Sequence, residues 1–331
     1  MTYRIRGRRR VEWSALIAAL LLVTTGCAQG AATRAQPSTS DRSGAGTSAA
    51  TPATGSPIRI MGAGDIAGDV EDATATADLI RAADPDAVFT TGDHAYPDGS
   101  PSEFAAKYDP TWGSFKSATH PVPGNHDYQS DGAAGYVGYF GPENVTNRDD
   151  GGLYYAWDVG NGWRAYAMNS EISTTGAQLT WLEEDVAAHP GRHYILYAHG
   201  PRFTSSTEHS PDEDICPLWD ALAATGGLEI VLAGHNHQYE RFSRMDCTGR
   251  ATADGARSFV IGSGGKTLYD LGRPAAGSEY RNNTDFGVLT LVLSEDFYEW
   301  EFIASGRGQE GSDKVATDNA GQVLDKGSDG L

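Results

Sequence analysis

Five short segments of the chain combine the residue types that bind metal ions in proteins. Each follows an apolar stretch and places Asp, Asn or His beside a small residue. They are Gly64-Asp65, Gly92-Asp93-His94-Ala95-Tyr96, Gly124-Asn125-His126-Asp127, Ala198-His199-Gly200 and Gly234-His235-Asn236-His237. Carboxylate, amide, phenol and imidazole groups suit hard to borderline metals such as iron, zinc or manganese, and these segments contain no thiolate that would favour a softer ion.

Each segment alone has an ordinary structural interpretation. An Asp after a Gly at the end of a strand usually forms a turn or caps a helix, and a single His is usually a structural side chain. The His-x-His pair of His235 and His237 is more suggestive, because alternate residues of a strand point the same way. Five such segments, each after an apolar strand, predict one shared site, because ligands of open α/β sheets bind beyond the carboxyl ends of the strands.

The elements that must position these segments alternate between strands and helices. We expect strands at 58–61, 86–91, 193–198 and 228–233, helices at 71–83, 176–189 and 212–225, a hairpin of 153–159 and 163–168 closed by Asn161-Gly162, and later strands at 238–245, 258–261, 287–293 and 297–303. The first strand–helix–strand unit implies a parallel pair of strands. The sequence therefore predicts a single mixed α/β domain.

The chain divides into four parts by composition. Residues 1–27 combine a basic stretch, an apolar run at 15–23 and Gly26-Cys27, which is typical of an export signal. Residues 28–56 are rich in Ala, Thr, Ser, Gly and Pro and predict a flexible tether. The mixed α/β domain is expected at 57–305, and 306–331 forms a polar tail that we expect to be disordered.

The end of the export signal resembles a bacterial lipobox, in which the Cys is lipidated after cleavage. Thr24 stands where that pattern usually has Leu, so both a cell-surface lipoprotein anchored through Cys27 and a simply secreted protein are consistent with it. Export would leave Cys216 and Cys247 as an even pair in an oxidising compartment. The sequence leaves open whether they form a disulfide or remain two buried thiols.

The overall charge of the chain limits the kinds of molecule that its surface can bind. The formal net charge is −19, and removal of the basic export signal would make the mature chain more acidic. Such a surface argues against nucleic-acid binding, which depends on Lys and Arg neutralising phosphates. A small phosphorylated substrate stays compatible with it, because bound metal ions reverse the local field.

The order of the five segments resembles that of the calcineurin-like metallophosphoesterase superfamily. This resemblance extends from Asp65 to the 234–237 segment and the strands beyond, and implies a four-layer fold in which a sandwich of mixed β-sheets is flanked by helices (αββα). Two positions indicate the subfamily. Most members have His two residues after the first Asp, where this chain has Ala67, and Tyr96 supplies the replacement ligand of purple acid phosphatases, whose second motif is Gly-Asp-x-x-Tyr. The extended segment 234–241 is also similar to the last motif of that group.

The resemblance implies which residues bind each of two metal ions. Asp65, Asp93, Tyr96 and His237 would bind the first, Asp93 would bridge to the second, and Asn125, His199 and His235 would complete the second. A phenolate ligand suits Fe(III), because the trivalent charge keeps the phenol ionised. The second ion would be a divalent Fe, Zn or Mn.

The resemblance also implies roles in hydrolysis. Two metals can bind phosphate oxygens and hold a hydroxide in line for attack. Asn125 would contact the phosphate, His126 would hydrogen-bond the phosphate or the departing oxygen, and His209 would protonate the leaving group. Arg202 would contact a substrate phosphate or only cap its loop, and His94 is expected to support the site or to be exposed rather than to react.

Three functions compete on this sequence. The leading hypothesis is an exported acid phosphatase acting on phosphate monoesters, and a phosphodiesterase or nucleotidase on the same scaffold is the second. The third is a surface-anchored binding protein with a degenerate site.

Two other motifs give weaker signals. Gly264-Gly265-Lys266-Thr267 resembles the end of a phosphate-binding loop, but Val260 stands where that loop needs Gly. The sequence contains no Gly-x-Ser-x-Gly elbow of a serine esterase.

Overall fold

The computed structural model describes residues 55–141, 152–311 and 313–331. The expected export signal, Cys27 and nearly all of the expected tether lie outside these residues. Within the described part of the chain, no helix combines the length and the apolar character needed to cross a membrane.

The first sheet carries three of the five ligand segments. Its strands are β1 (Ile58–Ala63), β2 (Ala87–Thr90), β3 (Thr119–Pro121), β11 (Asp285–Leu293), β12 (Phe297–Glu310), β13 (Asp313–Ala316) and β14 (Val323–Gly330). The order is β13-β12-β11-β1-β2-β3, with β14 also paired to β12. Strands β1, β2 and β3 are parallel, whereas β11 runs antiparallel to β1 and joins the C-terminal hairpins to the sheet.

The second sheet carries the other two segments. Its strands are β4 (Tyr155–Gly160), β5 (Trp163–Ala167), β6 (His193–Tyr197), β7 (Leu228–Ala233), β8 (Tyr239–Phe242), β9 (Arg257–Ile261) and β10 (Ser278–Asn282). The order is β10-β8-β9-β7-β6-β5-β4, with β5, β6, β7 and β9 parallel. The hairpin of β4 and β5 turns at Asn161 and Gly162, both at positive φ (48° and 82°), as the Asn-Gly pair predicts.

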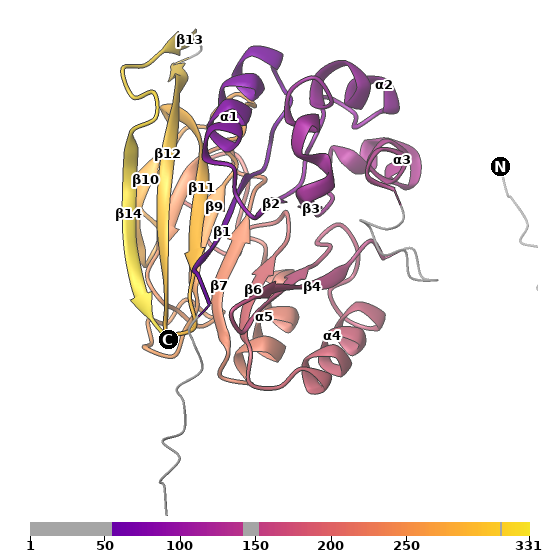
Figure 1. Ribbon diagram of the computed structural model, residues 1–331, viewed down its shortest axis with the longest axis vertical. Coiled ribbons are helices and arrows are strands. Elements are labelled where there is room, and N and C mark those ends of the chain that lie inside the picture. Colours follow the sequence, from indigo (N-terminus) through magenta and orange to yellow (C-terminus); the bar gives the residue numbers. More distant parts are fainter. Residues whose placement is uncertain (1–54, 142–151, 312) are drawn as a thin grey trace, which may run out of the picture. The chain divides into compact units, whose positions relative to one another are not determined.

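Helices cover the outer face of each sheet (Figure 1). They are α1 (Val70–Ala83), α2 (Pro101–Glu103), α3 (Ala134–Phe140), α4 (Ala177–Ala188) and α5 (Cys216–Ala223), together with the short π and 3₁₀ turns η1 (Phe104–Tyr108), η2 (Trp112–Ala118), η3 (Asp127–Gln129), η4 (Asp131–Ala133) and η5 (Glu213–Ile215). Residues of α1, η1 and α3 share a buried cluster with β1 and β2, and residues of α4 and α5 share another with β5, β6 and β7. A third cluster fills the space between the sheets. The expected four-layer arrangement is confirmed.

The expectation of a disordered tail after residue 305 is wrong. Strand β12 continues to Glu310, β13 follows, and β14 pairs with β12 from Phe297↔Gly330 to Ile303↔Val323. The polar composition of β14 has a structural reason, because Leu324 packs against the core between the sheets while Asp325, 8% exposed, binds groups of β8. Its carboxylate accepts hydrogen bonds from the Tyr239 hydroxyl and the Arg241 guanidinium, each at 2.8 Å.

Candidate metal centre

The five ligand segments meet where both sheets end. Asp65 follows β1, Asp93 follows β2, Asn125 follows β3, His199 follows β6, and His235 follows β7. The strands are parallel in these parts of the two sheets, so their carboxyl ends lie on the same side. The predicted convergence of these segments is therefore present in the fold.

The first group of side chains surrounds the hydroxyl of Tyr96. This oxygen lies 2.9 Å from Oδ1 of Asp65, 3.0 Å from Oδ2 of Asp93 and 3.2 Å from Nε2 of His237. Nε2 of His237 in turn lies 3.2 Å from Oδ1 of Asp65. Ala67, where most of the superfamily has His, is fully buried and its carbonyl accepts a 3.3 Å bond from the Tyr96 amide, so the missing ligand and its replacement are neighbours.

The second group surrounds the amide oxygen of Asn125. This oxygen lies 3.1 Å from Nε2 of His199 and 3.0 Å from Nδ1 of His235. Oδ2 of Asp93 belongs to both groups, because it lies 3.0 Å from the Tyr96 hydroxyl and 3.4 Å from Nε2 of His199. Asp65, Asp93 and His199 together offer three buried ligand atoms within 4.8 Å of one another.

Hydrogen bonds on the far side of two imidazole rings fix which nitrogen faces the cluster. Nδ1 of His199 lies 2.7 Å from the Thr91 carbonyl, and Nδ1 of His237 lies 2.7 Å from the Thr267 carbonyl. A carbonyl oxygen only accepts, so Nδ1 donates in both rings and Nε2 faces the centre, where it presents a lone pair to a metal ion when it carries no proton. These lone pairs face carboxylate and amide oxygens, which also only accept. The convergence of acceptors requires positive charge between them, and two metal ions fit it.

Burial and the charges within the metal-free cluster shift the pKa values of three of its side chains. Burial, and then the charges of Asp65 and Asp93, raise the pKa of the Tyr96 phenol well above its usual range. Burial lowers the pKa of His199, but the charge and hydrogen bond of Asp93, together with the charges of Asp65 and Glu171, outweigh burial and raise that pKa well above its usual range. Burial and the charge of His199 lower the pKa of His235 to about 3. Protons on Tyr96 and His199 therefore supply, without metal, the positive partners that the acceptors need.

The backbone is strained at three of the ligand positions. Asp65, Asp93 and His235 have positive φ angles of 57°, 54° and 66°, a region that residues other than Gly rarely adopt. Such strain costs of the order of 1–3 kcal/mol per residue and is typical of functional sites. It turns each side chain back toward the centre directly after its strand.

Three partly exposed rings pack against the ligands. His126 lies 4.5 Å from the Tyr96 ring, His209 lies 4.2 Å from the His235 ring, and Tyr269 lies 3.9 Å from the His237 ring, measured between centroids. The predicted residues His126 and His209 therefore both lie at the edge of the centre. Burial, and then the charge of His237, lower the pKa of His209. Tyr269 had no signal in the sequence, because its place depends on the path of the chain after β9.

Asp127 holds two of the ligand loops together. Its carboxylate accepts from the backbone amides of Asp93 at 3.0 Å and Gly124 at 2.9 Å, and from Nδ1 of His94 at 2.9 Å. The other nitrogen of His94 lies 2.7 Å from the Thr90 hydroxyl, within a buried aromatic cluster. His94 thus supports the site, as expected, whereas Asp127 received no role from the sequence although it closes the Gly-Asn-His-Asp segment.

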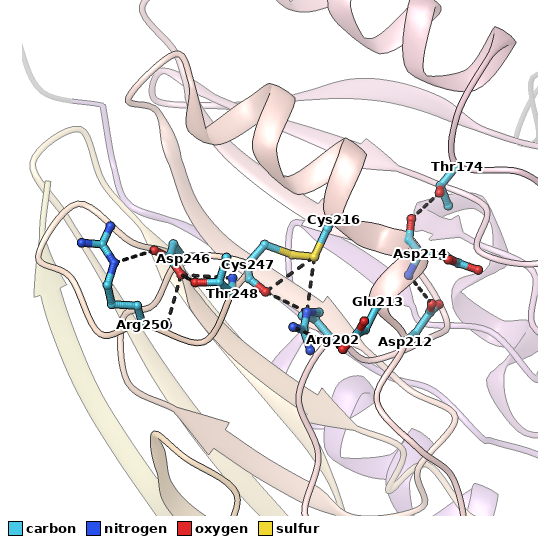
Figure 2. The surroundings of a disulfide bond; sticks show 10 residues. All are labelled: Thr174, Arg202, Asp212, Glu213, Asp214, Cys216, Asp246, Cys247, Thr248 and Arg250. Carbon is cyan, nitrogen blue, oxygen red and sulfur yellow. Dashed lines mark hydrogen bonds and ion pairs between the residues drawn. A yellow bond between two sulfur atoms is a disulfide. The ribbon is translucent and has the colours of Figure 1, made fainter.

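Arg202 lies beside a disulfide (Figure 2). Within the described residues, its polar contacts are with residues at that disulfide and with Glu213, and not with the ligand cluster. Cys216 and Cys247 form this disulfide, which resolves the alternative left open by the sequence. Nε of Arg202 donates to the Cys247 carbonyl at 2.8 Å, and its Nη2 lies 3.9 Å from Glu213. These contacts favour the loop-capping role for Arg202 over the contact with a substrate phosphate.

Two sheets between layers of helices, with metal-binding side chains on the strand ends of both sheets, form the arrangement of a metallophosphoesterase. A model of the calcineurin-like phosphoesterases matches residues 58–239, more than half of the chain. The chain therefore belongs to the calcineurin-like phosphoesterase family.

Its similar proteins include purple acid phosphatases. Purple acid phosphatase 22 of Arabidopsis thaliana is 24% identical over 275 residues, covering 74% of this chain and 59% of the relative, and purple acid phosphatase 23 of the same plant is 26% identical over 227 residues, covering 57% and 48%. The solved purple acid phosphatase PPD1 of yellow lupin shares the fold, with a TM-score of 0.60 and 19% identity over 82% of this chain and 53% of that protein. The chain thus spans about half the length of the purple acid phosphatases that it matches.

Proposed function

We propose that the protein is an exported phosphatase that hydrolyses phosphate monoesters with two metal ions. The observation that carries this proposal is the convergence of lone pairs from Asp93, Asn125 and His199, with the His199 ring held in the metal-binding tautomer by the Thr91 carbonyl. The ligands proposed for the first ion, Fe(III), are Asp65, Asp93, Tyr96 and His237. Those proposed for the second, a divalent Fe, Zn or Mn, are Asp93, Asn125, His199 and His235.

The residues around the ions divide the remaining work. When bound, the two ions neutralise the charge of the phosphate and lower the pKa of a water molecule, which can then act as the nucleophile. Asn125 adds a neutral ligand, so the second position accepts an anionic substrate without further repulsion. His126, fixed by a 2.8 Å bond from its amide to Asp93 and half-exposed at the rim, is placed to donate to a phosphate oxygen. His209, stacked on His235 at the same rim, is placed to donate a proton to the leaving oxygen.

Elemental analysis combined with a visible spectrum tests the proposal. Purified protein is expected to contain two metal ions per chain, one of them iron, and to show the charge-transfer band of an iron-bound phenolate. Hydrolysis of para-nitrophenyl phosphate is expected to exceed that of the bis-ester. Metal-free, colourless protein that takes up no iron would overturn the assignment of the first ion.

A phosphodiesterase or nucleotidase is the alternative enzyme. The same two ions serve either substrate, and the loops around the rim, which include 202–211, decide which leaving group is accommodated. Preference for the bis-ester in the same assay would favour this alternative.

A binding protein is the alternative from another class. The structure of GAP50, described as the anchor in the inner membrane complex of Plasmodium, has the same fold, with a TM-score of 0.57 and 13% identity over 81% of this chain and 92% of that protein. Here the full set of ligands weighs against a degenerate site. Bound metal with no hydrolysis of any phosphate ester would favour the binding role.

We also propose that the protein is exported and retained on the cell surface by lipid on Cys27. The basic and apolar N-terminal segment and the disulfide both support an oxidising destination. Fractionation of the native chain and of Cys27→Ser tests this: the variant is expected in the medium and the native chain with the membranes. Equal release of both would favour simple secretion.

A further inference from the structure

The segment that resembles the end of a phosphate-binding loop forms a wall of the metal centre instead. The amide of Lys266 donates to the Asp65 carbonyl at 2.9 Å, and the Thr267 carbonyl accepts from Nδ1 of His237 at 2.7 Å. The amide of Tyr269 donates to the His237 carbonyl at 2.9 Å. Residues 266–269 are therefore fixed against two ligands of the first group.

Small residues allow this segment to approach so closely. A Cβ on Gly265, whose φ is +147°, would lie 2.5 Å from the Ile66 carbonyl oxygen. A Cβ on Gly68 would lie 2.5 Å from Cδ of Lys266. The two glycines thus leave a passage through which the aliphatic part of Lys266 crosses toward Tyr96.

This path places a positive charge over the ring of Tyr96. Nζ of Lys266 lies 4.8 Å from the ring centroid, the side chain is half-buried, and within the described residues its ammonium makes no ion pair. The other Lys beside Tyr96 is Lys107, which donates to its main-chain carbonyl and not to its ring. Lys266 is therefore the charge that acts on the ring itself.

The position matters because of what surrounds the phenol oxygen. That oxygen lies within 3.0 Å of two carboxylates, Asp65 and Asp93, which oppose negative charge on Tyr96. A phenolate spreads its charge over the ring, so a cation above the ring face stabilises it more than the neutral phenol. The carboxylates act at the oxygen, and Lys266 acts against them at the ring.

We propose that Lys266 is a positioning residue whose charge above the ring of Tyr96 tunes the bond of this ligand to iron. This inference rests on the proposed iron–tyrosinate site. A positive charge closer to the ring than to the metal lowers the energy of the donor orbital more than that of the acceptor. The charge-transfer band is then displaced to shorter wavelength.

Three variants of the full chain test this proposal. Lys266→Met keeps much of the volume and removes the charge, Lys266→Arg keeps the charge, and Lys326→Met removes the same charge from the exposed side of β14 as a matched control. In the iron-loaded protein, Lys266→Met is expected to move the band to longer wavelength by about 10 to 40 nm. Lys266→Arg is expected to keep the band of the native protein, and Lys326→Met to leave it unmoved.

The outcomes separate this inference from the proposed function. A native chain without any phenolate band overturns the iron–tyrosinate site and this inference with it. A native band that does not move in Lys266→Met overturns the inference alone. If Lys266→Met does not fold, as judged by circular dichroism, Gly68→Ala is measured in its place, because it keeps the charge but displaces the Lys266 stem. A displacement to longer wavelength in Gly68→Ala supports the inference, and an unmoved band overturns it.

Discussion

The two halves of the metal centre differ in charge and in exposure. The half around Tyr96 contains two carboxylates and a phenol, and Asp65, Tyr96 and His237 are each no more than 2% exposed. The half around Asn125 contains one amide and two imidazoles besides the shared Asp93, and both Asn125 and His235 are partly exposed. The difference indicates that the first half suits a more highly charged ion that is retained, whereas the second suits a divalent ion that meets the substrate.

Removal of a ligand from the exposed half should have the largest effect. His235→Ala is expected to lower the metal content from two ions to one and kcat/KM by roughly a thousandfold or more, because several kcal/mol of charge stabilisation are lost with the second ion. The phenolate band should remain. Substantial activity in this variant, measured with metal content known, would contradict the two-metal mechanism.

The buried half is tested by Tyr96→Phe, which removes only the hydroxyl. We expect the visible band to disappear and kcat/KM to fall by about a hundredfold, the equivalent of about 3 kcal/mol. The raised pKa keeps this phenol protonated at neutral pH without metal, so native protein should release one more proton on metal uptake than the variant does. An unchanged spectrum would show that Tyr96 is not a ligand.

The leaving-group side of the centre is tested by His209→Ala. Activity on an alkyl phosphate, whose leaving oxygen needs a proton, is expected to fall by about a hundredfold. Activity on para-nitrophenyl phosphate should change much less, because nitrophenolate leaves without protonation. Equal losses on both substrates would assign His209 a binding role in place of acid catalysis.

The smallest catalytic effect is expected at Arg202. Its contacts lie at the disulfide, so Arg202→Ala should leave kcat/KM nearly unchanged while the loss of a hydrogen bond destabilises the fold by about 1 kcal/mol. Thermal unfolding should then shift by about 2–4 °C. A rise in KM without a change in stability would instead support the contact of Arg202 with a substrate phosphate.

The sequence predicted well those ligand positions that depend only on one strand and the residues after it. Asp65, Asp93 and His199 follow apolar strands directly, so the order of the segments was enough to bring them to one side of the sheets. Lys266 and Tyr269 were missed as members of the site, because their positions depend on contacts with Asp65 and His237 that are remote in sequence. Strand β14 was missed because its stability comes from pairing with β12 and from the carboxylate of Asp325, which compensates for few apolar residues.

The pairing of β1 with β11 has a consequence for the order of assembly. The register joins Ile58 to Leu293, so one edge of β1 stays open until nearly the whole domain has been synthesised. Contacts between residues so distant in sequence form slowly. Asp65 lies immediately beyond β1, and its loop cannot take its strained form before that strand is fixed. We therefore expect iron to enter a scaffold that is already assembled, which makes metal acquisition a late step in the maturation of this protein and not the nucleus around which it folds.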